Sequence, residues 1–253
     1  MIRYALLGLL QGLTEFLPVS SSGHLVLARA ALGMAVPGAA LEAAAHLGTL
    51  LALLLYFRRD LAHLAHIRRR GEERRYVGLL ALGTVPVAVV GFFARNAIER
   101  AFGSPSLVGW MLLVTAVVLV VGDRQARRAL RDRVRVMDAL AVGLAQAAAL
   151  LPGISRSGST VAKGIALGLR PSTAARFSLL LAIPAIAGAS AFALAQAAGR
   201  PGVEWAGLAT AMGCAFVSGL AAISLFLRIV RVGVLWPFAL YCTALGITVL
   251  VLG

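Results

Sequence analysis

Residues 152–164 read PGISRSGSTVAKG and interrupt a chain that is otherwise dominated by Leu, Ala and Val. Between positions 155 and 163 this stretch holds one Arg, one Lys, three Ser and one Thr, and apolar segments flank it on both sides. A Pro followed by Gly and Ser ends a helix, and lipid cannot satisfy the backbone groups that the break frees. The stretch therefore predicts a re-entrant helical hairpin whose tip is buried in protein or lines a cavity.

The composition is that of an integral membrane protein. Of 253 residues, 60% are hydrophobic and 13% are charged, and the mean hydropathy is +0.90. A soluble chain of this composition would expose too much apolar surface. The net charge of +14 comes from short Arg clusters between apolar stretches, with no aromatic interleaving, which argues against nucleic acid as a partner. Cys214 and Cys242 each lie alone in an apolar run, so neither a disulfide framework nor a CxxC metal site is expected.

The apolar segments divide into long and broken ones. Two are broken by Pro, Gly and Ser: residues 4–32 and residues 138–169. Six are long enough to cross a bilayer as helices: 39–57, 77–97, 107–122, 176–198, 204–227 and 234–252. The sequence thus predicts an all-α integral membrane protein with six transmembrane helices plus two re-entrant helical hairpins.

The arginines test this map. They follow the first, third and fifth predicted spans: Arg58, Arg59, Arg68, Arg69, Arg70, Arg74 and Arg75; Arg124, Arg127, Arg128, Arg131, Arg133 and Arg135; Arg228 and Arg231. If the two hairpins do not cross, all three clusters lie on one side, which the positive-inside rule makes cytoplasmic. Both termini are then predicted to be periplasmic. Few basic residues fall on that outer side: Arg3, Arg95, Arg100 and Arg200.

The two broken segments resemble each other. GLLQGLTEFLPVSSSG begins at Gly8 and GLAQAAALLPGISRSG begins at Gly143, an offset of 135 residues, and three predicted spans follow each segment. An odd number of spans inverts the second copy relative to the first, so the hairpin tips would meet near mid-membrane. We predict one membrane domain, 1–253, made of repeat 1 (1–122), a cytoplasmic linker (123–137) and repeat 2 (138–253). Chance similarity between two small-residue loops is the alternative.

Polar residues gather in the two predicted tips. Gln11 and Glu15 are four apart and share one helix face, and a run of polar residues, Ser20, Ser21, Ser22, Gly23 and His24, follows. The second tip supplies Ser155, Arg156, Ser157, Gly158, Ser159, Thr160 and Lys163. A guanidinium, hydroxyls and helix-start amides suit an anion, most naturally phosphate. A carboxylate can hold a divalent cation, a histidine can move protons, and a serine can attack phosphorus. Together these side chains indicate phosphoryl-group hydrolysis.

Structural alternatives stand beside these functional interpretations. A Ser/Gly-rich break also allows close helix packing in lipid, His24 could be a satisfied core histidine, and Arg156 could form a purely structural ion pair. Glu42 and His46 share a face at the outer end of the first span. They either extend the site or pair with each other.

GLTEFLPVSSSGH and LPGISRSGST, at residues 12–24 and 151–160, resemble the undecaprenyl-diphosphatase family, also called bacitracin-resistance proteins. The resemblance covers essentially the whole chain. It implies a bacterial inner-membrane enzyme that removes one phosphate from the C55 isoprenyl diphosphate carrier, which recycles the carrier for peptidoglycan synthesis. It also implies a divalent cation, Mg²⁺ or Ca²⁺.

The resemblance assigns roles by position. It implies Ser21 as nucleophile, His24 as base or proton shuttle, Glu15 as organiser of metal or water, and Arg156 as the residue that grips the diphosphate. Other diphosphate-binding residues are expected at the tips: Ser20, Ser22, Ser155, Ser157, Gly158 and Thr160. The metal ligands would be Glu15 and Gln11. Many members carry Glu where this chain has Gln11, so we expect altered metal dependence rather than loss of activity.

Two other functions compete with hydrolysis. Membrane transporters are also made of inverted repeats with broken helices, so the chain could be a transporter or flippase of polyprenyl phosphates. A non-catalytic scaffold in a cell-wall complex is the weaker alternative. Ser21, His24 and Glu15 together favour hydrolysis, because transport needs neither a base nor a nucleophile. The expected partner is the membrane lipid substrate, and the oligomeric state, monomer or homodimer, is left open.

Overall fold

The computed structural model describes residues 1–32, 39–65, 71–198 and 204–252, and these residues fold into α-helices without any β-strand. The predicted all-α class is confirmed. Arg68, Arg69, Arg70 and Arg200, which the sequence assigns to the two sides of the membrane, lie outside the described residues. In chain order the helices are α1 (Ile2–Phe16), α2 (Ser21–Ala31), α3 (Ala39–Tyr56), α4 (Arg58–Ala65), α5 (Gly71–Phe93), α6 (Arg95–Ala101), α7 (Pro105–Ala126), α8 (Val136–Ala148), α9 (Arg156–Ala166), α10 (Pro171–Ala198), α11 (Trp205–Arg231) and α12 (Trp236–Leu252).

The long helices correspond to the predicted spans. Within the described residues, α5, α7, α10 and α11 are long and apolar enough to cross a membrane, and the α3–α4 pair, bent by 70°, adds a fifth span if it is counted as one. The sixth predicted span, α12, is 17 residues long, which is at the short end of the lengths that cross a bilayer. The integral-membrane class is thus confirmed, while length and composition support four or five of the six predicted spans.

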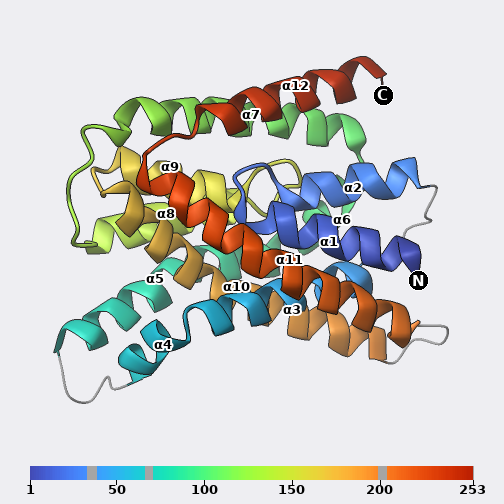
Figure 1. Ribbon diagram of the computed structural model, residues 1–253, viewed down its shortest axis with the longest axis horizontal. Helices are drawn as coiled ribbons and strands as arrows, with labels where there is room; N and C mark the ends of the chain where they lie inside the picture. Colours follow the sequence, from blue (N-terminus) through green and yellow to red (C-terminus); the bar gives the residue numbers. More distant parts are fainter. Residues whose placement is uncertain (33–38, 66–70, 199–203, 253) are drawn as a thin grey trace.

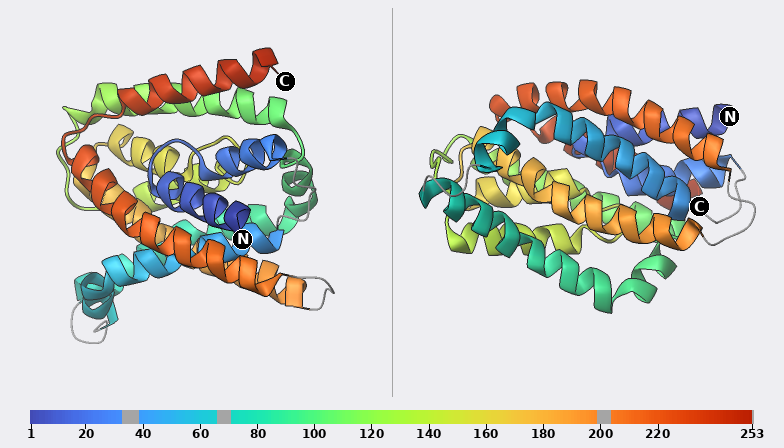
Figure 2. Two further views of the ribbon diagram at one scale, coloured as in Figure 1. Left: turned by 45° about the vertical axis from the view of Figure 1, so that its right-hand side comes forward. Right: turned by 90° about the horizontal axis from the view of Figure 1, so that it is seen from below.

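The two broken segments form helical hairpins in the interior. Figures 1 and 2 show α1–α2 and α8–α9 between the α7–α12 pair on one side and α3, α10 and α11 on the other. At 15, 11, 13 and 11 residues, α1, α2, α8 and α9 are each too short to cross the hydrocarbon core. Their polar turns are therefore enclosed by protein rather than by lipid.

Each hairpin packs closely on one long helix through an equivalent glycine. A Cβ on Gly8 of α1 would lie 2.3 Å from the carbonyl oxygen of Ala211 in α11. A Cβ on Gly143 of α8 would lie 2.3 Å from the carbonyl oxygen of Gly83 in α5. Because Gly8 and Gly143 are 135 residues apart, the repeated motif performs the same packing task twice. The assignment of 1–122 and 138–253 as inverted repeats remains a prediction.

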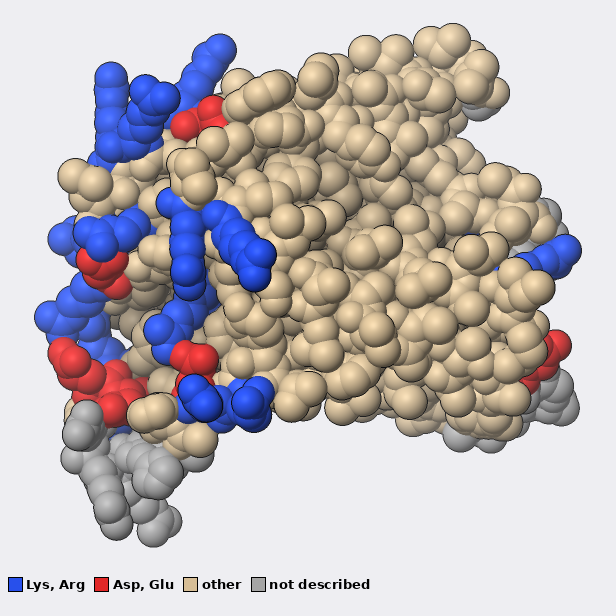
Figure 3. Space-filling model, in the orientation of Figure 1, with Lys and Arg blue, Asp and Glu red and all other residues tan. Residues whose placement is uncertain are grey.

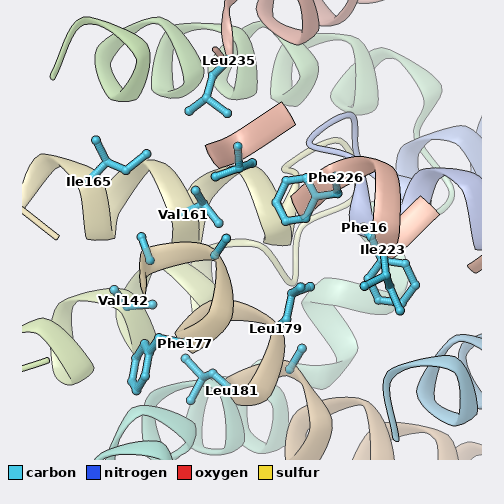
Figure 4. Close-up of a cluster of buried hydrophobic side chains, with 14 of the residues drawn as sticks. Phe16, Val142, Val161, Ile165, Phe177, Leu179, Leu181, Ile223, Phe226 and Leu235 are labelled. Atoms are coloured by element: carbon cyan, nitrogen blue, oxygen red, sulfur yellow. The ribbon is translucent and has the colours of Figure 1, made fainter. Parts of the chain in front are cut away.

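A large apolar core fixes the position of the first tip. Phe16, the last residue of α1, is fully buried, and Figure 4 shows it beside Ile223 of α11. Phe226 lies one turn further along α11 in the same cluster. Because Phe16 directly follows Glu15, burial of its ring sets the direction in which the neighbouring carboxylate points.

The basic residues gather at one end of the molecule, on the left of Figure 3. Ion pairs join their segments there: Asp60 with Arg176, Glu72 with Arg133 at 4.0 Å, and Asp132 with Arg170 at 3.2 Å. α1 begins and α12 ends at the opposite end (Figure 1). The described Arg clusters therefore share one side, as the sequence predicts.

The predicted linker anchors the second hairpin at both ends. Arg131 donates two hydrogen bonds to Asp138, at 2.5 and 2.9 Å, and Asp138 also accepts one from the Arg135 amide at the start of α8. These hydrogen bonds raise the pKa of the Arg131 guanidinium, so the pair stays charged. The Arg131 backbone also bonds Gly168 and Arg170, beyond the end of α9.

Candidate active site

The tips of the two hairpins are in direct contact. The amide of Gly153 donates to Ser20 Oγ at 3.1 Å, and Ser157 Oγ donates to the carbonyl of Leu17 at 3.1 Å. Both bonds join groups that are 133 to 140 residues apart in sequence. Residues from the two halves of the chain therefore form one site.

A serine starts the returning helix in each hairpin. Ser20 is the N-cap of α2, and its Oγ accepts from the Gly23 amide at 3.3 Å. Ser155 is the N-cap of α9, and its Oγ accepts from the Gly158 amide at 3.1 Å. Each turn contains one residue with a positive φ: Ser20 at +68° in the first, where residues other than glycine rarely adopt it, and Gly153 at +99° in the second. The residues after the caps, Ser21 and Arg156, begin their helices facing the site.

An ion pair crosses the interface between the tips. Arg156 Nη2 donates to Glu15 Oε1 at 2.6 Å, and the side chains are 17% and 4% exposed, respectively. The other terminal nitrogen, Arg156 Nη1, is buried and has no hydrogen-bond partner among the described residues. Burying a cationic N–H group without an acceptor is costly, so this nitrogen marks a place for an anion.

The second oxygen of Glu15 is also occupied. Glu15 Oε2 accepts from Gln11 Nε2 at 2.7 Å and from Ser21 Oγ at 2.5 Å. Within the described chain Ser21 makes no hydrogen bond to His24. The structure thus places Glu15, rather than the predicted His24, next to the hydroxyl of Ser21.

His24 is held by a different set of contacts. Its Nδ1 lies 2.8 Å from the carbonyl of Ser20, and its Nε2 lies 2.6 Å from the hydroxyl of Tyr241. Because a carbonyl only accepts, Nδ1 carries the proton of the neutral ring and Nε2 accepts from Tyr241. The two rings also stack, with centroids 5.6 Å apart. Tyr241 lies in the apolar helix α12, and nothing in the sequence pointed to it.

Comparison with known proteins identifies the family. Residues 4–248 match the family described as "Bacitracin resistance protein BacA". The chain belongs to the BacA family. It is 43% identical to an undecaprenyl-diphosphatase of Syntrophotalea carbinolica over 248 residues, which cover 95% of this chain and 94% of that protein. It is 40% identical to an undecaprenyl-diphosphatase of Geobacter sulfurreducens, and the match covers 97% of this chain and 96% of that protein. It is also 40% identical to "Undecaprenyl-diphosphatase 3" of Frankia alni, and that match covers 97% of this chain and 92% of that protein.

Several predicted diphosphate ligands of this BacA-family chain are bonded within the fold. Ser157 Oγ donates to Leu17, and Thr160 Oγ1 bonds the carbonyl of Arg156 at 2.7 Å and Ser178 Oγ at 2.5 Å. The buried members of the predicted set are Ser20, Ser155, Ser157, Gly158 and Thr160. Partly exposed members are Ser21, Ser22 and Arg156. An incoming phosphate can reach Ser21 and Ser22 without rearrangement, whereas the Nη1 nitrogen of Arg156 is buried.

His46 extends the site from α3. Its Nε2 lies 3.6 Å from Glu15 Oε2, and its Nδ1 lies 2.7 Å from the carbonyl of Glu42. The carboxylate of Glu42 is engaged elsewhere, because it accepts from Arg29 at 2.5 Å. Of the two alternatives that the sequence left open, His46 adjoins the site and Glu42 positions it through the backbone.

The side chains around Glu15 suit a cation that phosphate oxygens also bind. The described residues hold no cluster of three or more His, Cys, Asp or Glu side chains able to bind a metal alone. Gln11 is fully buried, however, and its Oε1 has no hydrogen-bond donor. One carboxylate and one unpaired amide oxygen are too few for a Ca²⁺ cage, but Mg²⁺ is commonly held by one or two protein ligands and substrate phosphates.

Proposed function

We propose that this protein hydrolyses undecaprenyl diphosphate to undecaprenyl phosphate and inorganic phosphate, which recycles the lipid carrier for peptidoglycan synthesis. The BacA family match over residues 4–248 and the names of the relatives support this activity. The observation that carries it is the buried, unpartnered Arg156 Nη1 beside Glu15. A diphosphate supplies the acceptor that this nitrogen lacks, and its charge offsets the buried guanidinium.

Ser21 is the proposed nucleophile and Glu15 the proposed base. The 2.5 Å hydrogen bond from Ser21 Oγ to Glu15 Oε2 directs the hydroxyl proton toward the carboxylate. Oγ bonds to the terminal phosphorus while the bond to the bridging oxygen breaks, the proton passes to Glu15, and undecaprenyl phosphate leaves. Water then attacks the phosphoserine, which releases inorganic phosphate and restores the hydroxyl.

His24 and Tyr241 are proposed to exchange protons with the departing groups. Their 2.6 Å hydrogen bond joins the first hairpin tip to α12. Imidazole gains or loses a proton near neutral pH, which suits a shuttle. The imidazole ring is held at both nitrogens, because Tyr241 bonds Nε2 and the carbonyl of Ser20 bonds Nδ1.

A divalent cation is part of the proposal, and the small number of protein oxygens favours Mg²⁺ over Ca²⁺. Glu15 and Gln11 Oε1 would hold it together with diphosphate oxygens, and when bound it would neutralise charge that develops on the phosphates. Gln11 would serve through its carbonyl oxygen, the buried acceptor without a donor.

The proposed location is the bacterial inner membrane, with the Arg-rich end in the cytoplasm and both termini in the periplasm. The Arg clusters at one end of the molecule support this orientation through the positive-inside rule. The isoprenoid tail stays in lipid between helices, while the diphosphate enters the polar tips from the outer leaflet.

A phosphate-release assay tests the proposal against a transporter. Purified protein in detergent, given C55 diphosphate and a divalent cation, is expected to release phosphate, and chelator is expected to stop it. A transporter would give no signal in this assay, because detergent micelles do not separate two compartments. Arg156→Ala and Ser21→Ala should lose turnover, with substrate binding largely retained in Ser21→Ala. Ser224→Ala, which alters a hydroxyl bonded within α11, is the matched control and should be active. No release with Mg²⁺, Ca²⁺ or Mn²⁺ would favour the carrier.

A further inference from the structure

A second polar region lies away from the hairpin tips, at the Arg-rich end of the molecule (Figure 3). A cavity of about 840 Å³ opens there, and none of its described lining residues belongs to α1, α2, α8 or α9. Three spans begin or end at this cavity: Glu72 is the second residue of α5, Ser172 is the second residue of α10 and Arg231 is the last residue of α11. α4 adds a wall after a bend of 70° from α3. The cavity therefore lies at the level of the membrane surface.

The carboxylates that line this cavity are already engaged. Their partners are as follows: Asp60 pairs with Arg176, Asp132 with Arg170 at 3.2 Å and Glu72 with Arg133 at 4.0 Å, and Glu73 has a partner as well. Asp132 also accepts a hydrogen bond from the hydroxyl of Thr173 at 3.1 Å. The negative charge of the lining is thus balanced within the protein.

Two guanidinium groups of the lining are not balanced in this way. Arg59 of α4 and Arg231 of α11 are exposed, and neither side chain makes an ion pair or a hydrogen bond within the described residues. Because they come from different helices and line one cavity, a single anion held there would interact favourably with both charges. Arginine also presents a planar fork of N–H donors that matches the oxygens of a phosphate group.

Uncharged donors line the same cavity. Tyr76 packs its ring edge-on against Phe177, with centroids 5.9 Å apart, and its hydroxyl has no hydrogen bond within the described chain. At the start of α10, the amide of Ala174 bonds the carbonyl of Arg170 at 2.9 Å, whereas the amide of Ser172 has no backbone acceptor. A free amide at a helix start favours an anion. These neutral donors therefore suit the same kind of ligand as the two arginines.

The rest of the lining is apolar. Phe57 and Leu180 are only 4% and 2% exposed, and Leu64 and Leu227 pack against the same hydrophobic core. A free phosphate ion would use only the polar part of such a cavity. A phospholipid would use both parts, because its phosphodiester is an anion and its acyl chains are apolar. Basic pockets between transmembrane helices at the cytoplasmic surface bind anionic lipid headgroups in the same way.

We propose that this cavity binds the headgroup of an anionic phospholipid, with Arg59, Arg231 and Tyr76 as donors to its phosphodiester. The lipid belongs to the leaflet at the Arg-rich end, and it links α4, α5 and α11 at that surface. This inference does not rest on the proposed function, because the cavity shares no residue with the candidate active site.

Lipid binding to the full-length protein in detergent tests the proposal. Phosphatidylglycerol or phosphatidylcholine is titrated in, and bound lipid is counted by native mass spectrometry. The wild type should bind one phosphatidylglycerol more tightly than phosphatidylcholine. The double variant Arg59→Gln/Arg231→Gln should bind phosphatidylglycerol about 30-fold more weakly, with phosphatidylcholine unaffected. The matched control is Arg124→Gln/Arg127→Gln, which removes the same charge from exposed residues outside the cavity and should bind like the wild type.

Tyr76→Phe gives a second measurement that changes no charge. It removes only the unbonded hydroxyl and should weaken phosphatidylglycerol binding about fivefold, so it decides the matter if the double arginine variant does not fold. The melting temperature in detergent, measured without added lipid, verifies folding.

Several outcomes would overturn the proposal. Unchanged phosphatidylglycerol binding in the folded double variant or in Tyr76→Phe would remove these donors from a lipid site. An equal loss in the control variant would mean that surface charge alone attracts the lipid. Equal binding of the two lipids by the wild type would exclude selectivity for an anion. Displacement of phosphatidylglycerol by millimolar inorganic phosphate would show that the cavity takes a free phosphate ion instead of a headgroup.

Discussion

Ser20 and Ser155 occupy the same place in the two hairpins, where each caps a helix by accepting from a glycine amide three residues ahead. The next residue differs. It is Ser21 in the first hairpin and Arg156 in the second, and the two side chains bond opposite oxygens of Glu15. Leu150, 135 residues after Glu15, stands at the equivalent position of the second hairpin. Two hairpins of one construction thus form an asymmetric site, because only the first supplies a carboxylate.

The buried amides show the same difference. Gln11 bonds Glu15, one turn further along α1. Gln146, its equivalent 135 residues later, is 1% exposed, and neither of its amide atoms has a hydrogen-bond partner among the described residues. The residue one turn further on is Leu150, which offers no acceptor. On the proposed mechanism, the acid–base groups therefore lie in the first hairpin, and the guanidinium proposed to bind the diphosphate lies in the second.

The largest expected effect comes from removing the one carboxylate. Glu15→Gln keeps the size of the side chain but takes away the proposed base, so kcat should fall by about 10²–10⁴-fold in the phosphate-release assay. Leu150→Gln places the same residue at the equivalent point of the second hairpin and should be far less damaging. Equal losses in the two folded variants would contradict the asymmetry.

The capping serines should differ in their effect on stability. Ser20 Oγ accepts from Gly23 and also from Gly153 of the other tip, whereas the hydrogen-bond partners of Ser155 Oγ in the described chain, Gly158 and Ser157, both belong to its own hairpin. Ser155→Ala should therefore lower the free energy of unfolding by about 1 kcal/mol, and Ser20→Ala by about 2 kcal/mol. Thermal unfolding in detergent measures both, and a smaller loss for Ser20→Ala would show that the contact between the tips stabilises little.

Restoring a carboxylate at position 11 should change the cation requirement. Gln11→Glu adds a negative hard oxygen ligand, so the half-saturating concentration of Mg²⁺ or Ca²⁺ should fall by about tenfold. The measurement is phosphate release against cation concentration, with Gln146→Glu as the equivalent change in the second hairpin. An unchanged requirement in Gln11→Glu would remove position 11 from the cation site.

The smallest effect is expected from the unpaired amide of the second hairpin. Gln146→Leu removes two buried polar atoms that lack partners, so it should raise the free energy of unfolding by about 1 kcal/mol without changing turnover. Gln11→Leu, which breaks the bond to Glu15, should instead destabilise the protein. Lower thermal stability of Gln146→Leu would mean that its amide is hydrogen-bonded in the membrane-embedded protein.

The sequence predicted the hairpins because Pro, Gly and Ser interrupt apolar segments at a repeated spacing. It placed Glu15 and Arg156 in tips that the predicted inverted topology would bring together. The contacts of His24 could not be predicted in the same way. Its partner Tyr241 is a tyrosine in a mostly apolar helix, and no local spacing reveals which helix its hydroxyl faces. The internal bonding of Thr160 depends on the path of the turns, which composition does not specify.

The distance of His46 from Glu15 was undecided at the level of sequence, because the i, i+4 spacing of Glu42 and His46 fits a local pair as well as a site. Packing of α3 against α1 and α11 decides it, since it turns His46 toward the hairpin tip. Span counting was uncertain at α12 for another reason. Its 17 residues are mostly apolar, and a helix of this length fits either a short span or a buried helix.

The most direct test is a double-mutant cycle on kcat/KM for Glu15→Gln, Arg156→Lys and the combined variant, measured with radiolabelled C55 diphosphate. If the two half-helices bring these side chains into one reaction centre, the losses are strongly non-additive, and the combined variant is scarcely worse than the poorer single one. Losses that simply multiply would mean that the carboxylate and the guanidinium act apart, and the two-tip site would have to be abandoned.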